Sequence, residues 1–228
     1  MQAGRQPLEI TTLSDLTELG RHRLSEHFFM RDMLYSEVSN FCGVPNIPAD
    51  PGLAIAAGEQ LCKQVLEPLR AAFGHIAIRS AYRSPVLNAH CHELHKQGVA
   101  ESWCTCNEDN FAHHIWDRRD EHGYLGAVAT VVVPAYIDHY ERTGDWQSLG
   151  WWIADNLQHY AEVQFFRRLG AFNIRWYEGP SNKSVGYLDP PTRITLTKAG
   201  ETDFDQDHSH LYSAVIGPLL QTPKGGVS

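Results

Sequence analysis

The chain has 228 residues, a formal net charge of -8 at neutral pH and a hydrophobic content of 43%. A chain of this length can bury one sizeable core, and its aromatic side chains are spread along the sequence, which argues against intrinsic disorder. The negative charge disfavours non-specific attraction to nucleic-acid phosphates and to anionic cell-wall polymers. We predict a single globular domain over residues 1–228 that has no nucleic-acid partner.

The beginning of the chain gives few structural signals. Residues 1–20 are polar and weakly periodic, and we expect residues 1–24 to form a mobile arm or an edge element. Residues 1–10 lack the basic start, apolar run and cleavage site of a secretory signal, and no stretch approaches the roughly 18 apolar residues of a membrane span. These absences predict a cytoplasmic protein without a membrane partner, and a phage-encoded lysin would share them.

A long helix is the clearest element that the sequence predicts. Asp50 is a suitable N-cap, Pro51 suits the first turn, an apolar stripe follows, and Gly74 ends the helix. A second clear element is the run of small and β-branched residues at 125–133, which predicts a strand buried on both faces.

The remaining segments predict an α+β fold, with a central, mostly antiparallel sheet flanked by helices. The other expected elements are a short helix within 25–38, a strand at 75–80, a helix from Ser84 toward His95, a long functional loop at 98–123, helices at 134–142 and 145–157, and strands at 162–166, 171–178 and 193–197.

The five cysteines form an odd set without Cys-x-x-Cys pairs, so we expect reduced thiols rather than a disulfide framework. Two groups combine sulfur and imidazole, one around Cys91 and one around Cys104. They have the donor types of a zinc site but not the spacing of the common structural sites. Free or buried thiols are the favoured interpretation.

The segment that carries most chemistry is the corner between the strand at 75–80 and the next helix, which has the sequence Ser80-Ala81-Tyr82-Arg83-Ser84-Pro85-Val86-Leu87-Asn88. A guanidinium at the end of a strand, facing a cleft, offers a fork of donors to a carboxylate or to a developing oxyanion. The alternative interpretation is an arginine bonded to loop carbonyls, with Ser84 serving only as a helix cap.

This corner resembles the S-x-Y-R-S-x-x-x-N signature of the zinc D-alanyl-D-alanine carboxypeptidase and dipeptidase superfamily, which also includes the hedgehog signalling fold. The resemblance extends in element order over residues 28–176, but only the corner matches closely. It implies a carboxypeptidase-like, hedgehog-like fold in which Arg83 binds the substrate or stabilises the tetrahedral intermediate. Ser80 and Tyr82 are then expected to contact the substrate beside it.

Two of the three zinc-ligand positions of that family are changed here. The family motif S-x-H-x-x-G-x-A-x-D supplies a ligand Asp, and Thr130 stands at that position in the strand at 126–134. The family's third ligand is a His on a late strand, and its counterpart in Phe-Asn-Ile-Arg-Trp is Asn173. A neutral hydroxyl and a neutral amide bind zinc poorly, so tight binding requires a substitute donor. The candidate substitutes are His159, Glu162, His208 and His210.

The family's remaining ligand is a His, for which His113 or His114 is the counterpart. Both lie further upstream than the family spacing allows, which makes residues 115–124 an insertion. A register that pairs His113 with Asp120 keeps the spacing but abandons the apolar strand. A rebuilt site instead joins either histidine to Asp117, and we take His113, His114 and Asp117 as the predicted zinc ligands.

The resemblance implies two alternative functions. The first is a metal-dependent hydrolase of amide or peptide bonds, in which Arg83 stabilises the oxyanion and Asp117 or Glu162 is the general base for a zinc-bound water. The second is a repurposed or zinc-free member of the same fold that binds or acts on a small amino-acid-like ligand. In both, the partner is a small peptide or amino-acid-like molecule, and Asn173 and Trp176 belong to its binding site.

Overall fold

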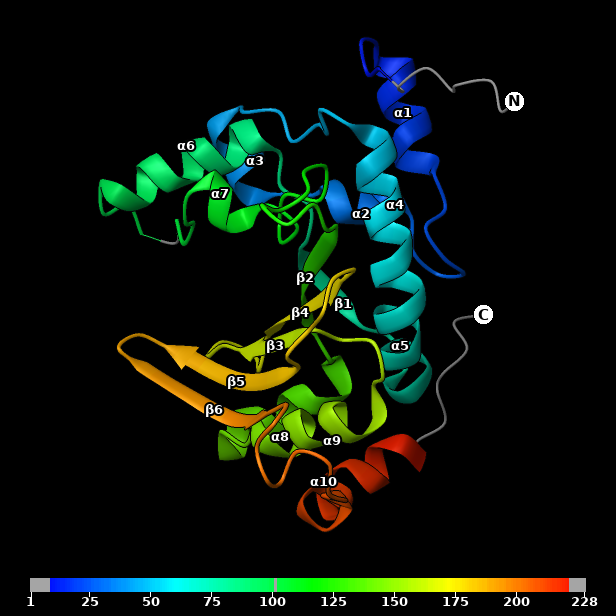
Figure 1. The fold of residues 1–228 in the computed structure, drawn as a ribbon, viewed down its shortest axis with the longest axis vertical. Coiled ribbons are helices and arrows are strands. Elements are labelled where there is room, and N and C mark those ends of the chain that lie inside the picture. The colour runs from blue at the N-terminus through cyan, green and yellow to red at the C-terminus, as the bar shows by residue number, and fades with distance from the viewer. Residues whose placement is uncertain (1–8, 101, 222–228) are drawn as a thin grey trace. The chain divides into compact units, whose positions relative to one another are not determined.

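The computed structural model describes residues 9–100 and 102–221, whose helices and strands are drawn in Figure 1. Internal contacts divide the chain into two compact units, each assembled from two stretches of sequence. The first unit holds the residues up to Cys62 and Ser80–Val128, and the second holds Lys63–Arg79 and the residues from Ala129 onward. The single domain over residues 1–228 stays a prediction. Across the described ranges, no helix has both the length and the apolar character needed to cross a membrane.

The first unit is built mainly from helices, which are α1 (Leu13–Arg21), α2 (Met30–Leu34), α3 (Glu37–Cys42), α4 (Pro51–Leu61), α6 (Pro85–Lys96) and α7 (Asn107–Asn110). Helix α1 starts with a capping box: the Asp15 backbone N–H donates to Thr12 Oγ1 at 3.1 Å, and the Thr12 N–H donates to the Asp15 carboxylate at 2.8 Å. The predicted N-terminal arm therefore contains a capped helix. Residues 1–8 of that arm lie outside the described residues.

The long helix predicted after Asp50 is confirmed. The Leu53 backbone N–H donates to the Asp50 carboxylate at 3.0 Å, and Pro51 occupies the first turn. After α4 the chain continues through a π-helical segment, Cys62–Leu66, into α5 (Glu67–Phe73). Gly74 ends α5 with a φ of +80°, a conformation that residues with a Cβ rarely adopt.

The strands form one sheet with the order β1-β2-β4-β3-β5-β6. Their bounds are β1 (Ala77–Ser80), β2 (Gly126–Val132), β3 (Glu162–Phe165), β4 (Phe172–Tyr177), β5 (Ser184–Asp189) and β6 (Thr192–Lys198). β3 runs antiparallel to β4 and parallel to β5, and β5 runs antiparallel to β6. Every residue of β2 is buried except Thr130, as expected for a strand covered on both faces. The predicted α+β class is confirmed.

The second unit also contains helices α8 (Pro134–Thr143), α9 (Gln147–Asn156) and α10 (Ser209–Gln221). Helix α9 packs on β5 and β6, which Figure 1 shows as the orange hairpin beside it. Gly150 makes this approach possible, because a Cβ there would lie 2.8 Å from Leu196 Cδ2 and 3.2 Å from Val185 Cγ1. Helix α10 packs on α9, and neither α10 nor β5 was among the predicted elements.

Candidate functional site

The corner identified in the sequence places Arg83 between β1 and α6. Its Nη1 donates hydrogen bonds to Asn88 Oδ1 at 2.9 Å and to Cys104 Sγ at 3.1 Å. Protein atoms surround most of the guanidinium, and this desolvation lowers the pKa of Arg83 to about 10, although part of the residue still reaches solvent. Among the described residues no carboxylate lies within ion-pairing distance of it. Arg83 is therefore a largely desolvated cation without a protein counterion.

Asn88 holds the guanidinium in place from the first turns of α6. This side chain is fully buried, and besides accepting from Arg83 it donates to the Thr105 carbonyl at 3.1 Å and to Asn107 Oδ1 at 2.8 Å. Three bonds on one amide fix its orientation, because its oxygen must face the arginine and its nitrogen the loop. Asn88 therefore positions the guanidinium of Arg83.

A second buried amide, Asn46, fixes the backbone of the corner. Its Nδ2 donates to the carbonyls of Tyr82 at 2.9 Å and Leu34 at 3.0 Å, and its Oδ1 accepts from the Ser84 N–H at 2.7 Å. Ser84 in turn caps α6, since its Oγ accepts from the Leu87 N–H at 3.2 Å. The capping role considered for Ser84 is thus confirmed, whereas Arg83 bonds to side chains and not to the loop carbonyls of the alternative interpretation.

Cys91 of α6 and Cys104 of the following loop form a disulfide, which corrects the expectation of reduced thiols for these two residues. Both are nearly inaccessible, with 2% and 4% of their surface exposed. Cys42, Cys62 and Cys106 are not part of a disulfide. The disulfide ties the loop to α6 and brings a neutral sulfur against the guanidinium of Arg83.

His114 lies on the other side of the corner, where its carbonyl accepts from the Arg83 backbone N–H at 2.8 Å. Its imidazole is buried and its Nδ1 lies 2.9 Å from the Ala81 carbonyl. Burial, followed by the charge of Arg83 and the neighbouring His113, holds the pKa of His114 well below its ordinary value of 6.5. A neutral ring must carry its proton on Nδ1 to donate to this carbonyl, which leaves a lone pair on Nε2.

The three predicted zinc ligands are near one another in sequence but make different contacts. The rings of His113 and His114 meet edge to face, with centroids 5.1 Å apart. Asp117 is fully buried, and its Oδ2 accepts the backbone N–H groups of Ala49 at 2.7 Å and Asp50 at 3.3 Å. Within residues 9–100 and 102–221, no three His, Cys, Asp or Glu side chains are grouped closely enough to hold a metal ion.

Tyr82 belongs to the core of the first unit, because only 1% of its surface is exposed and its ring meets Trp116 edge-on at 6.0 Å. Burial, with a smaller effect of the nearby Asp117 carboxylate, raises the pKa of Tyr82 far above its ordinary value. Its hydroxyl makes no hydrogen bond with any described residue. A ligand would have to enter the core to reach it. Ser80 ends β1 and is partly exposed.

Thr130 and Asn173, which the resemblance predicts at the other two zinc-ligand positions, are hydrogen-bonded to each other. The Thr130 hydroxyl donates to Asn173 Oδ1 at 2.6 Å, between β2 and β4. The sequence had indicated that both positions would be neutral, and the structure brings them together. A neutral hydroxyl bonded to a neutral amide does not fit a zinc ion, which prefers imidazole, thiolate or carboxylate ligands.

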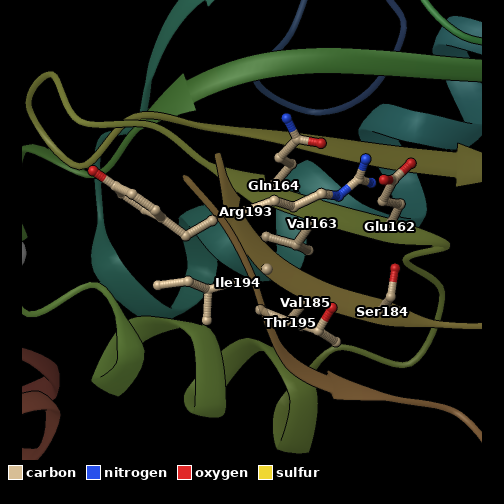
Figure 2. A pocket seen from close by; sticks show the side chains of 10 residues that line it. Glu162, Val163, Gln164, Ser184, Val185, Arg193, Ile194 and Thr195 are labelled. Carbon is tan, nitrogen blue, oxygen red and sulfur yellow. The ribbon is translucent and has the colours of Figure 1, made fainter. Parts of the chain in front are cut away.

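The two remaining predicted site residues, Trp176 and Glu162, lie in the second unit. Asn173 and Trp176 face opposite sides of β4, because buried and part-exposed residues alternate along this strand. The Trp176 indole donates to Gln64 Oε1 at 3.1 Å, which ties it to the π-helical segment Cys62–Leu66. Glu162 lies at the start of β3, where it lines a hollow of about 40 Å³ with Gln164 and Arg193. Figure 2 labels these three side chains among those that line the hollow.

Sequence reasoning missed Asn46 and the Cys91–Cys104 disulfide. Asn46 lies in a loop rich in proline and asparagine, a composition that predicts a turn but does not indicate which side chain is buried. The cysteines are separated by 13 residues without a recognisable spacing motif. Comparison with known proteins adds no further assignment: no protein-family model, no curated protein and no solved structure matches this chain.

Proposed function

We propose that Arg83 is the anion-binding centre of a site for a small carboxylate ligand of the amino-acid or short-peptide class, in a zinc-free relative of the D-alanyl-D-alanine carboxypeptidases. The observation that carries this proposal is the guanidinium that Asn88 and the disulfide sulfur hold in place but no described carboxylate neutralises. Buried charges in proteins are normally paired. An external anion supplies the missing partner.

The geometry of Arg83 favours a carboxylate as that anion. Only Nη1 is used by the protein, so the remaining guanidinium donors are free to form the two parallel hydrogen bonds typical of arginine–carboxylate pairs. Because the guanidinium is already fixed through Nη1, less side-chain entropy is lost when the ligand binds. Hydrogen bonds to charged groups contribute about 1.5 to 3 kcal/mol, or roughly 10- to 150-fold in affinity.

The neutral imidazole of His114 favours a ligand that also carries an N–H group. With its proton on Nδ1, the ring presents a hydrogen-bond acceptor at Nε2 and adds no second positive charge next to Arg83. An ammonium or amide N–H complements this acceptor. A carboxylate and an N–H on neighbouring atoms are the groups of an amino acid or a peptide C-terminus.

The donor groups support the zinc-free alternative over the metal-dependent hydrolase. Asp117 Oδ2 is engaged by two backbone N–H groups, and Thr130 and Asn173 form a neutral hydrogen-bonded pair. Metal analysis of the purified protein separates the two alternatives. Near-stoichiometric zinc that is lost in His114→Ala would support the hydrolase and contradict a zinc-free protein.

Binding of the site's ligand is tested with a pair of probes that differ only in charge. D-alanyl-D-alanine carries the carboxylate, and its C-terminal amide does not. Isothermal titration calorimetry should detect binding of the acid and weaker or undetectable binding of the amide. Arg83→Met should weaken binding of the acid roughly 10- to 150-fold, and Arg83→Lys should fall between, because lysine keeps the charge but not the fork of donors.

Arg21→Met is the matched control. Arg21 is an exposed arginine of α1 that pairs with Glu18 at 3.0 Å, so its replacement changes the net charge equally and leaves the corner intact. Circular dichroism confirms that each variant is folded before titration. Equal binding of acid and amide, or equal affinity of wild type and Arg83→Met, would show that Arg83 is not the anion-binding group.

A further inference from the structure

The Cys91–Cys104 disulfide beside Arg83 can be reduced, and its reduction would change the charge next to the guanidinium. Cys104 Sγ lies 3.1 Å from Arg83 Nη1 and is bonded to Cys91 Sγ. In the disulfide this sulfur is neutral and only a weak hydrogen-bond acceptor. Arg83 therefore keeps its full charge for an external anion as long as the disulfide is intact.

Reduction changes the charge balance at the same atom. A dithiol reductant supplies two electrons and two protons, the Cys91–Cys104 bond breaks into two thiols, and the reductant becomes a disulfide. Cys104 then loses its proton to solvent more readily than an ordinary cysteine, because a neighbouring arginine stabilises the thiolate. The resulting thiolate is a counterion within hydrogen-bond distance of Arg83.

The groups around this sulfur do not compete for that role. His92 lies 2.9 Å from the Cys104 carbonyl through Nδ1, His114 faces Arg83 as a neutral ring, and Asn88 is uncharged. None of them is an anion, and no described carboxylate pairs with Arg83. Among the residues that the structure describes, the Cys104 sulfur is thus the one group hydrogen-bonded to the Arg83 side chain that can become negatively charged.

We propose that the Cys91–Cys104 disulfide is a redox switch for the ligand site, in which the oxidised form leaves Arg83 available to a ligand carboxylate and the reduced form neutralises Arg83 with the Cys104 thiolate. This inference rests on the proposed function for its ligand, but the thiolate–arginine pair stands on the geometry alone. The two parts can therefore be tested separately.

The matched variants are Cys91→Ser and Cys104→Ser, both studied in the presence of a phosphine reductant. Each lacks the disulfide, but only Cys91→Ser keeps a group beside Arg83 that ionises. The ultraviolet absorbance of the thiolate against pH, taken as the difference between the two variants, gives the pKa of Cys104. We expect it about one unit or more below the ordinary value of about 8.5, with a return toward that value in Cys91→Ser/Arg83→Met.

The second measurement is the affinity for D-alanyl-D-alanine. At about pH 8.5, one unit above the expected pKa of Cys104, Cys104→Ser should bind roughly tenfold more tightly than Cys91→Ser, because about nine tenths of the Cys104 thiol is then ionised and a serine hydroxyl does not neutralise the arginine. The difference should disappear at mildly acidic pH, where the Cys104 thiol is protonated. Wild type treated with a dithiol should lose affinity in the same way, which tests the switch without any substitution.

The outcomes separate the two proposals. An ordinary pKa for Cys104 in Cys91→Ser, unchanged by Arg83→Met, would refute the thiolate–arginine pair whatever the ligand does. Equal dipeptide affinity of the two serine variants over the whole pH range would refute the switch. If oxidised wild type and Cys104→Ser both fail to bind the dipeptide, the proposed function is wrong, and the absorbance titration still decides the pairing.

Discussion

The low pKa of His114 predicts that the protein loses stability in mild acid. In the unfolded chain this histidine binds a proton below about pH 6.5, whereas in the folded protein it stays neutral to a much lower pH. Between the two pKa values the unfolded state holds one more proton than the folded state, so stability falls as the pH falls. The expected loss between about pH 7.5 and about pH 5.5 is about 1.4 kcal/mol from this residue alone.

The measurement is urea unfolding of wild type and His114→Asn at these two pH values. Asparagine can still donate to the Ala81 carbonyl but does not titrate, so the variant should lose about 1.4 kcal/mol less than wild type over the same range. Replacing the exposed His122 by asparagine controls for the removal of a histidine outside the corner. Identical pH dependence of wild type and His114→Asn would mean that His114 accepts a proton in the folded protein.

Three further substitutions test the packing, each by urea denaturation. Asn46→Ala should cost at least about 1 to 3 kcal/mol, because it leaves buried backbone groups of the corner without partners; a smaller loss would mean that water replaces the amide. Gly150→Ala should cost about 1 to 3 kcal/mol, since its Cβ would lie 2.8 Å from Leu196, and an unchanged midpoint would contradict the close packing of α9 on the sheet. Tyr82→Phe should change stability by less than about 0.5 kcal/mol or raise it, because the buried hydroxyl has no partner among the described residues; a loss well above that would indicate a bridging water.

The sequence predicted those elements whose local signals and tertiary environment agree. The helix after Asp50 has a cap, a proline in its first turn and a terminating glycine, and each has that role in the structure. The strand β2 was recognisable because burial on both faces leaves an unbroken apolar run. In both cases the sequence pattern was long enough to identify the element without knowledge of its tertiary contacts.

Two of the elements that the sequence did not predict, β5 and α10, contain residues that weaken their own pattern. β5 is interrupted by Gly186, yet the glycine is required there, because a Cβ would lie 2.6 Å from the Ile194 carbonyl oxygen of β6. Helix α10 contains Pro218 in its interior, which ordinarily argues against a helix. Its packing on α9, and the His208–Asp155 contact of 2.8 Å at its start, are tertiary interactions that no local pattern reveals.

The sequence predicted Arg83 as a residue of the candidate site but did not predict most of the groups around it. The signature nominated Arg83 and included Asn88, but the absence of a carboxylate near the guanidinium depends on side chains from other segments. The disulfide joins residues whose spacing in sequence carries no motif. Which predicted donor atoms already accept hydrogen bonds, as Asp117 Oδ2 does from two backbone N–H groups, also becomes visible only in three dimensions.

The disulfide connects the ligand site to the redox conditions around the protein. Disulfides persist in oxidising compartments, whereas the thiol systems of the cytoplasm keep cysteines reduced. Under the proposed switch, in a reducing compartment Cys104 is a thiol, and its thiolate provides Arg83 with an internal counterion before any ligand arrives. In an oxidising setting the same arginine depends on an external anion for its neutralisation. The proposed switch therefore makes Arg83 a structural residue in one compartment and a binding residue in the other.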